Sequence, residues 1–190
     1  DKYLPCFKVV DQNAFSNVGN SNCNYMQNDP HISERQLLAS VKEARFSPRE
    51  MPLYFFVLKA LQNVERVKIL DLGGAAGSHY FSISKEIGDS IIDKYYICEI
   101  PFFVDFHQRN HLCPKLRCIT SEHIDSIKDE NFDIAFISGT LQYIKDYACV
   151  IERIKAIGPR YVVIARLPAW DKKTIQVLQY HRKCHSTAVG

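Results

Sequence analysis

The stretch that decides the fold is Val67-Lys-Ile-Leu-Asp-Leu-Gly-Gly-Ala-Ala-Gly-Ser78. An apolar run ends at Asp71, a glycine-rich turn follows, and residues 78–87 have the pattern of a helix. A strand, a tight glycine turn and a helix form the first unit of a nucleotide-binding α/β sheet, because glycine lets the backbone turn sharply and lie against a ligand. The sequence therefore predicts an α/β fold with a ligand at this turn.

The glycine turn distinguishes between two kinds of ligand. A dinucleotide-binding turn has the pattern Gly-x-Gly-x-x-Gly, with a pyrophosphate at the helix N-terminus. Ala75 and Ser78 stand at the second and third glycine positions of that pattern, so the match fails twice. The turn fits Asp-x-Gly-x-x-x-Gly, formed by Asp71, Gly73 and Gly77. This is similar to the first motif of the class I S-adenosylmethionine-dependent methyltransferases; a glycine-rich corner without a ligand is the alternative.

The composition limits the class of protein. The chain has 190 residues, of which 46% are hydrophobic, and this length suits one domain with a three-layer core. Its 24 basic and 21 acidic residues give a net charge of +3 without a basic cluster, so we expect no nucleic-acid partner. No apolar run reaches the roughly 20 residues of a transmembrane helix, so we expect no membrane span. The chain begins with Asp1, which leaves a preceding segment open.

The seven cysteines show no metal-binding or disulfide pattern. None are spaced as Cys-x-x-Cys, and the nearest approach is Cys113-Pro-Lys-Leu-Arg-Cys118. Cys98 and Cys149 lie in apolar runs, where a free thiol behaves as a small hydrophobic group. We therefore expect no metal site and a reducing, cytoplasmic location.

Strands and helices alternate from Val67 onward. Strands are predicted at residues 67–72, 94–99, 116–119, 132–138, 161–167 and 174–178. Helices are predicted at residues 78–87, 102–108 and 146–157, with at most a short helix at 121–127. This alternation predicts a Rossmann-like, doubly wound and mostly parallel sheet. We expect one methyltransferase-like domain over 1–190, with its core at 65–180.

Residues 1–64 are expected to form an N-terminal loop and a helical cap. Residues 1–30 are rich in asparagine, which disfavours regular structure and indicates a loop or a lid. Ser33-Glu-Arg-Gln36 is a capping box that begins one helix, and Ser47-Pro-Arg-Glu50 begins a second. The apolar stripes of these two helices are either plain core or a wall of the cofactor cleft.

The ends of the predicted strands supply the candidate binding residues, because ligands of such sheets bind beyond the carboxyl ends of the strands. Glu99 can accept hydrogen bonds from both ribose hydroxyls, or it is a solvated surface acid. Ser121 either contacts the adenine or caps a helix. Ser138 and Gly139 end the fourth strand, where Gly139 allows a ligand to approach. Asp71 is expected to orient the turn and the ammonium group of the cofactor.

Backbone and cofactor are expected to meet at the turn, at Gly73, Gly74 and Gly77. A side chain at Gly77 would then fill the space of the cofactor. The variant Gly77→Val is therefore expected to lose binding while its secondary structure stays near that of the wild type.

Two residues are candidates for catalysis. Methyl transfer from a sulfonium is an in-line displacement, and a base is needed only when the acceptor must lose a proton. His79 is the one histidine at the turn, and it either acts as that base or supports the turn. The sequence shows no carboxylate placed to orient its ring. Tyr143 is the second candidate, and Tyr80 and Arg166 are alternatives for holding an acceptor.

The chain also resembles a known family as a whole. The motifs that carry the resemblance are Leu70-Asp-Leu-Gly-Gly-Ala-Ala-Gly-Ser-His-Tyr-Phe81, Cys98-Glu-Ile-Pro101, Ile137-Ser-Gly-Thr-Leu-Gln-Tyr143, Ile157-Gly-Pro-Arg-Tyr161 and Ala165-Arg-Leu-Pro168. In this order they resemble a bacterial family of class I methyltransferases found beside surface-polysaccharide biosynthesis genes. The resemblance implies S-adenosylmethionine as cofactor, held through Asp71, Gly73, Gly77 and Glu99. It also implies a cytoplasmic enzyme acting on a sugar or sugar-linked small molecule.

Other functions remain open from the sequence. A class I fold ends with a helix and a strand hairpin after the sixth strand, and only residues 181–190 remain here. The seventh strand is therefore missing or belongs to a continuation of the chain. One alternative is a catalytically silent methyltransferase-like subunit that binds a partner at the open sheet edge. A nicotinamide-dependent enzyme is another. The sequence does not indicate an oligomeric state.

Overall fold

The computed structural model describes residues 6–9, 33–144, 146–167 and 177–180 of the chain. The chain divides into two compact units, one formed by Tyr25–Pro168 and the other by Asp1–Asn24 with Ala169–Gly190. In the second unit, strand β1 (Cys6–Val9) pairs antiparallel with strand β7 (Val177–Tyr180). The expectation of a single domain over the whole chain stays a prediction.

Two predictions for this unit need correction. The sequence predicts a loop over residues 1–30, yet residues 6–9 form a strand, because pairing with β7 satisfies backbone groups that the local sequence leaves open. The strand predicted at 174–178 belongs to the parallel core in that prediction, whereas its described part, from Val177, pairs with β1. The other residues of both predictions lie outside the described part of the chain.

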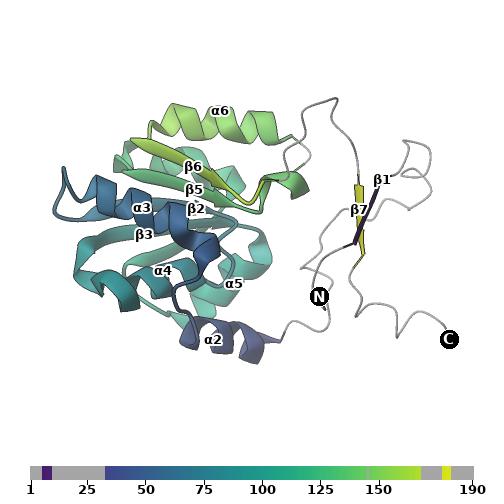
Figure 1. The fold of residues 1–190 in the computed structure, drawn as a ribbon, viewed down its shortest axis with the longest axis horizontal. Coiled ribbons are helices and arrows are strands. Elements are labelled where there is room, and N and C mark those ends of the chain that lie inside the picture. The colour runs from purple at the N-terminus through teal and green to yellow at the C-terminus, as the bar shows by residue number, and fades with distance from the viewer. Residues whose placement is uncertain (1–5, 10–32, 145, 168–176, 181–190) are drawn as a thin grey trace. The chain divides into compact units, whose positions relative to one another are not determined.

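The first unit contains a five-stranded sheet in which all strands are parallel (Figure 1). Its strands are β2 (Val67–Leu72), β3 (Ile92–Glu99), β4 (Leu116–Thr120), β5 (Ile134–Ser138) and β6 (Tyr161–Ala165). Their order across the sheet is β4-β3-β2-β5-β6. This confirms the predicted Rossmann-like, doubly wound fold and five of the six predicted strands.

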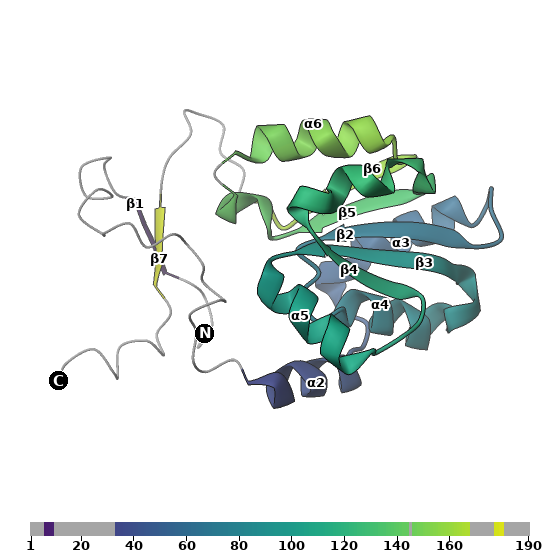
Figure 2. The ribbon, with the colours of Figure 1, turned by 180° about the vertical axis from the view of Figure 1, so that it is seen from behind.

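Helices cover both faces of the sheet (Figures 1 and 2). The α-helices of this unit are α2 (Glu34–Lys42), α3 (Met51–Ala60), α4 (Ser78–Ile83), α5 (Pro101–Asn110) and α6 (Tyr147–Ile157). The 3₁₀ segments are η1 (Pro48–Glu50), η3 (Asp89–Ile91), η4 (Ser121–Glu130) and η5 (Leu141–Tyr143), and η2 (Ser84–Gly88) is a π-helical segment. The predicted helices at 78–87, 102–108 and 146–157 are confirmed, and the short helix at 121 is the 3₁₀ segment η4.

Two apolar cores lie on opposite faces of the sheet, because successive strand residues point to opposite sides. On one face, α3 and α4 pack with residues such as Ile69 and Phe136. On the other face, α6 and η4 pack with residues such as Leu70 and Ile137. Strands that are buried on both faces have near-continuous apolar sequences, and β2 and β5 have such sequences.

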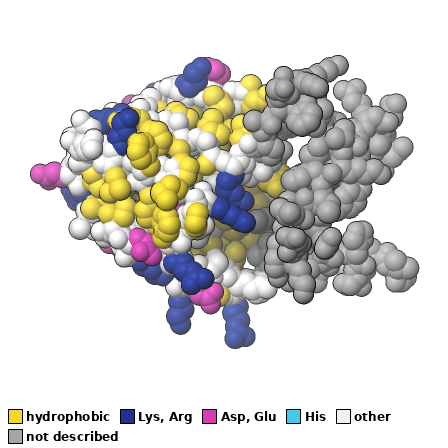
Figure 3. Space-filling view, viewed as in Figure 1, with side chains coloured by type: hydrophobic (Ala, Val, Ile, Leu, Met, Phe, Trp, Pro, Cys, Tyr) yellow, Lys and Arg dark blue, Asp and Glu magenta, His cyan; other side chains and the backbone are white. Residues whose placement is uncertain are grey.

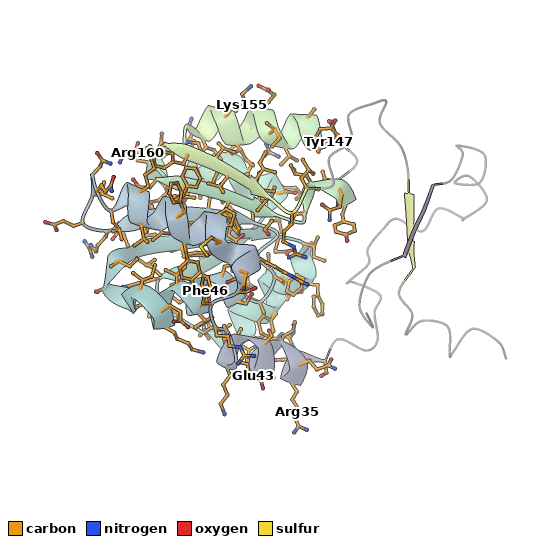
Figure 4. All side chains as sticks on the ribbon, in the orientation of Figure 1. Arg35, Glu43, Phe46, Tyr147, Lys155 and Arg160 are labelled. Carbon is orange, nitrogen blue, oxygen red and sulfur yellow. The ribbon has the colours of Figure 1, made fainter. Side chains whose placement is uncertain are left out.

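The two helices before the sheet have different surroundings. Leu53 and Val57 of α3 are fully buried against the sheet, so the stripe of this helix is plain core. Its outer face is apolar as well, with Phe55 57% exposed, and hydrophobic side chains gather there in Figure 3. The capping box predicted at the start of α2 is confirmed, and Val41 of α2 packs near the glycine turn. Arg35 points away from α2 (Figure 4), and Glu43, the residue that follows α2, is exposed.

The order of the strands fixes where a ligand can bind. From β2 the chain goes to β3 and β4 on one side of the sheet, and then to β5 and β6 on the other. The carboxyl ends of β2 and β5 are therefore the switch point at which ligands of doubly wound sheets bind. Among the described helices, none is both long and apolar enough to cross a membrane.

Candidate functional site

The turn after β2 depends on glycine for two reasons. Gly73 and Gly77 have φ of +79° and +90°, a region that side chains disfavour. A Cβ on Gly73 would overlap the side chain of Thr140, and one on Gly74 would lie 2.5 Å from Asp71 Oδ2. The turn therefore packs closely against Thr140, which follows β5, and against the Asp71 carboxylate of β2.

Asp71 is fully buried beneath this turn. Its Oδ2 atom accepts a hydrogen bond of 2.8 Å from the Tyr95 hydroxyl and lies 2.8 Å from His79 Nδ1. Its Oδ1 atom is buried without a hydrogen-bond partner among the described residues. Because an unpartnered buried carboxylate oxygen is costly, Asp71 is suited to a cationic or hydrogen-bond-donating ligand.

His79 lies between two carboxylates. Besides Asp71 at Nδ1, Glu50 Oε1 is 4.0 Å from His79 Nε2, and the ring stacks edge-on against Phe136. Burial lowers the pKa of His79, but attraction and hydrogen bonding by Asp71, with Glu50, outweigh burial and the opposing charge of Arg166. The pKa of His79 is therefore raised. The expectation that no carboxylate orients this ring is wrong.

Glu99 connects the end of β3 to the glycine turn. Its Oε1 atom accepts a hydrogen bond of 3.0 Å from Ala75 N, and its Oε2 atom accepts one of 2.8 Å from Ile100 N. Burial raises the pKa of Glu99, the two backbone bonds lower it, and the charge of Asp71 raises it; the net direction is upward. Glu99 is partly buried, which disfavours the alternative of a solvated surface acid.

The end of β5 lies on the other side of β2 from Glu99 and forms a second part of the site. Ser138 Oγ is buried without a hydrogen-bond partner in the described part of the chain. Gly139 has φ +65°, and a Cβ there would lie 3.5 Å from Arg166 Cζ. Arg166 itself has φ +56°, in the left-handed region. Tyr143, on η5, is half-exposed.

Two candidate residues have surroundings that differ from the expectation. Ser121 is exposed and is the first residue of η4, whose N-cap is Thr120, so the capping role is wrong. A Cβ on Gly77 would lie 3.2 Å from Leu116 Cδ1 and 3.3 Å from Ile97 Cδ1. These close contacts and the φ of +90° disfavour a side chain at Gly77 within the fold itself, which is a different reason from contact with a cofactor.

Sequence reasoning missed three residues of this site. Glu50 and Tyr95 contact the His79–Asp71 pair from η1 and β3. His107 Nε2 lies 2.9 Å from the Ala75 carbonyl; burial lowers the pKa of His107, and the bond to Ala75 opposes this only in part. Glu50 stands in a helix-start motif, but no local motif connects these three residues to the turn, because only the packing of distant elements brings them there. In the described part of the chain, no group of three His, Cys, Asp or Glu could hold a metal ion.

No protein-family model matches the chain, and no curated protein matches it in sequence. Among solved structures, it is similar to an S-adenosylmethionine-dependent methyltransferase from Aquifex aeolicus, with 17% identity, 75% of this chain and 78% of that chain covered, and a TM-score of 0.46. It is also similar to the N-methyltransferase NodS from Bradyrhizobium japonicum in complex with S-adenosyl-L-homocysteine, with 17% identity, 65% of each chain covered and a TM-score of 0.39.

A third similar structure is CalS10 from Micromonospora echinaspora, an amino pentose methyltransferase involved in calicheamicin biosynthesis. The identity is 13%, 67% of this chain and 51% of that chain are covered, and the TM-score is 0.43. The chain spans about half the length of several such structures, for example 54% and 47% of two others. Identities of 13–17% and TM-scores below 0.5 do not assign a function to this chain.

Proposed function

We propose that this protein is an S-adenosylmethionine-dependent methyltransferase that binds its cofactor at the carboxyl ends of β2, β3 and β5. The observation that carries the proposal is the pair of carboxylates that hold the glycine turn. Asp71 lies beneath the turn with a free buried oxygen, and Glu99 accepts the amide hydrogen of Ala75 within it. Asp71 lies near the carboxyl end of β2, at the switch point of the sheet where a ligand is expected, and Glu99 ends the neighbouring strand β3.

The charge of this turn favours a cation. S-adenosylmethionine has a sulfonium and an ammonium group, and it has no phosphate. Asp71 and Glu99 would attract the positive groups, whereas a dinucleotide would bring its pyrophosphate close to both carboxylates. Since Ala75 and Ser78 also break the dinucleotide pattern, a nicotinamide cofactor is disfavoured.

The roles that we propose for the residues follow from these positions. Asp71 would bind the ammonium group, and Glu99 would accept the ribose hydroxyls with the lone pairs that its bonds to Ala75 N and Ile100 N leave available. The backbone of the turn and of Ser138–Gly139 would line the cofactor, with Ser121 at the adenine. When bound, the cofactor supplies an activated methyl group, and the protein has to align the acceptor and exclude water. His79 would hold a proton close to the turn, and Tyr143 and Arg166 would contact the acceptor.

For the acceptor we propose a small molecule, a sugar or a sugar-linked intermediate of surface-polysaccharide synthesis, in a cytoplasmic setting. This part of the proposal is supported only by the resemblance of the motifs between residues 36 and 177. We do not favour a catalytically silent subunit, because the acids, the glycine turn and His79 together keep the features that cofactor binding requires.

Calorimetric titration with S-adenosylmethionine, S-adenosylhomocysteine and NAD tests the proposed cofactor. We expect saturable binding of the first two compounds and none of the third. The variant Glu43→Gln, at an exposed residue that follows the end of α2, is the matched control and should bind like the wild type. Binding of NAD alone, or of none of the three, would rule out the methyltransferase proposal. Transfer of a radiolabelled methyl group to nucleotide-sugar acceptors then tests the substrate class.

A further inference from the structure

One histidine of the site, His79, lies between two carboxylates from separate elements. His79 Nδ1, at the start of α4, is 2.8 Å from Asp71 Oδ2 at the end of β2. His79 Nε2 is 4.0 Å from Glu50 Oε1 at the end of η1. The His79 side chain is 12% exposed and that of Asp71 is 1% exposed, so water screens this group of charges poorly.

The second oxygen of each carboxylate is also informative. Asp71 Oδ1 and Glu50 Oε2 are buried, and neither has a hydrogen-bond partner among the residues that the structure describes. The Tyr95 hydroxyl donates to Asp71, and the charge of Arg166 opposes protonation of His79. The other titratable groups that interact with the two acids are Tyr54 with Glu50, and Glu99 and Cys118 with Asp71. The buried Asp71 and the partly buried Glu50 thus face one imidazole, and the Oδ1 atom of Asp71 is available for an additional positive group.

We propose that Asp71 and Glu50 together hold His79 as an imidazolium in the unliganded protein, and that binding of S-adenosylmethionine releases this proton. This inference rests on the proposed function. A cationic ligand beside Asp71 repels the imidazolium, so the proton leaves Nε2 for solvent while the proton at Nδ1 stays on the bond to Asp71. Neutral His79 then has a free lone pair on Nε2, which makes a base available only when the cofactor is bound.

Glu50 is the positioning residue in this arrangement. The raised pKa of His79 agrees with this role of Glu50. Burial and the charge of Arg166 lower this pKa, but Asp71, which has the larger effect of the two acids, and Glu50 together raise it by more. A Glu50→Gln substitution keeps the size of the side chain and removes one of the two negative charges. The pKa of His79 should therefore fall in this variant while Asp71 still orients the ring.

Two measurements without turnover test the inference. The first is calorimetry of S-adenosylmethionine binding at pH 7 in phosphate and in Tris, whose ionisation enthalpies differ; the difference gives the number of protons released. We expect the wild type and Glu43→Gln to release a fraction of a proton, up to about one. Glu50→Gln should release clearly less, and His79→Gln should release none through this residue.

The second measurement is the titration of the His79 ring by NMR in the unliganded protein. We expect a pKa above the ordinary value of about 6.5 in the wild type and a lower pKa in Glu50→Gln. This readout stands even if His79→Gln does not fold. Binding with an enthalpy independent of the buffer would overturn the proton release but leave the cofactor assignment intact. A ring pKa that Glu50→Gln does not change would overturn the role of Glu50, and absence of any binding would overturn both proposals.

Discussion

His79 Nδ1 lies 2.8 Å from Asp71 Oδ2, so the helix that follows the glycine turn is tied to the strand that precedes it. A second connection crosses the same turn, since Glu99 Oε1 accepts a hydrogen bond from Ala75 N. The backbone between residues 72 and 78 is therefore fixed at its base by Asp71 and at its middle by Glu99. A turn held in this way is organised before a ligand binds, which lowers the entropic cost of binding.

The pairing of His79 with Asp71 makes the stability of the protein depend on pH. The pKa of His79 is raised above its ordinary value of 6.5, so its charged pairing contributes fully below pH 6.5. This contribution is lost as the pH rises through the folded-state pKa. We expect the free energy of unfolding in urea to fall over this window in the wild type, and His79→Gln to remove that part of the pH dependence. The exposed His123→Gln is the control; the same loss in both variants would contradict the pairing.

Gly77 should be intolerant of a side chain because of the fold. A Cβ there is 3.2 Å from Leu116 Cδ1, and the φ of +90° adds backbone strain. Gly158 has φ +71° and nothing within 4 Å of an added Cβ, so Gly158→Ala measures the strain alone, about 1–2 kcal/mol. We expect Gly77→Ala to cost about 1–3 kcal/mol more than this in thermal or chemical denaturation.

The close contacts of Gly77 also change the outcome that we expect for Gly77→Val. The sequence predicts that Gly77→Val loses only binding, whereas the structure predicts that it loses stability too. Equal costs for Gly77→Ala and Gly158→Ala would show that the neighbouring side chains move aside freely.

Glu99 should contribute to cofactor affinity through its charge. Glu99→Gln keeps one oxygen that can accept from Ala75 N and loses the acceptor for Ile100 N, which lies outside the glycine turn, so the turn should stay folded. We expect the affinity for S-adenosylmethionine to fall by about 1–3 kcal/mol, the range for hydrogen bonds to charged groups. Calorimetry gives this value directly. Glu152→Gln, an exposed acid of α6, should bind as the wild type does, and unchanged affinity in Glu99→Gln would remove Glu99 from the site.

Helix α3 has one leucine in the core and one on the surface, so the effects of the same substitution on stability can be compared. Leu53 is fully buried against the sheet, and Leu58 on the outer face is 55% exposed. Leu53→Ala should reduce the free energy of unfolding by about 2–5 kcal/mol, as buried leucines do. Leu58→Ala should change it by less than about 0.5 kcal/mol. A large loss for Leu58→Ala would indicate that another surface covers this face of α3 in solution.

The site could be predicted only in part from the sequence. Asp71, the glycines and Glu99 stand in local patterns at strand ends, and parallel strands bring such ends to one edge. Their neighbours could not be predicted. Glu50 and Tyr95 meet His79 and Asp71 across long separations in sequence, and nothing in the local pattern of either residue marks it.

What the sequence by itself determined is the architecture. Alternating apolar strands and helices bury their surfaces by packing helices against a mostly parallel sheet, and the turn after Leu72 needs glycines wherever a Cβ would collide. Tertiary structure alone decided the electrostatics, namely that His79 is flanked by two acids and that Gly77 faces Leu116. It also decided that residues 177–180 pair with β1. The physical reason is that periodicity and turn chemistry are local, whereas a pKa or a packing distance depends on residues that only folding brings together.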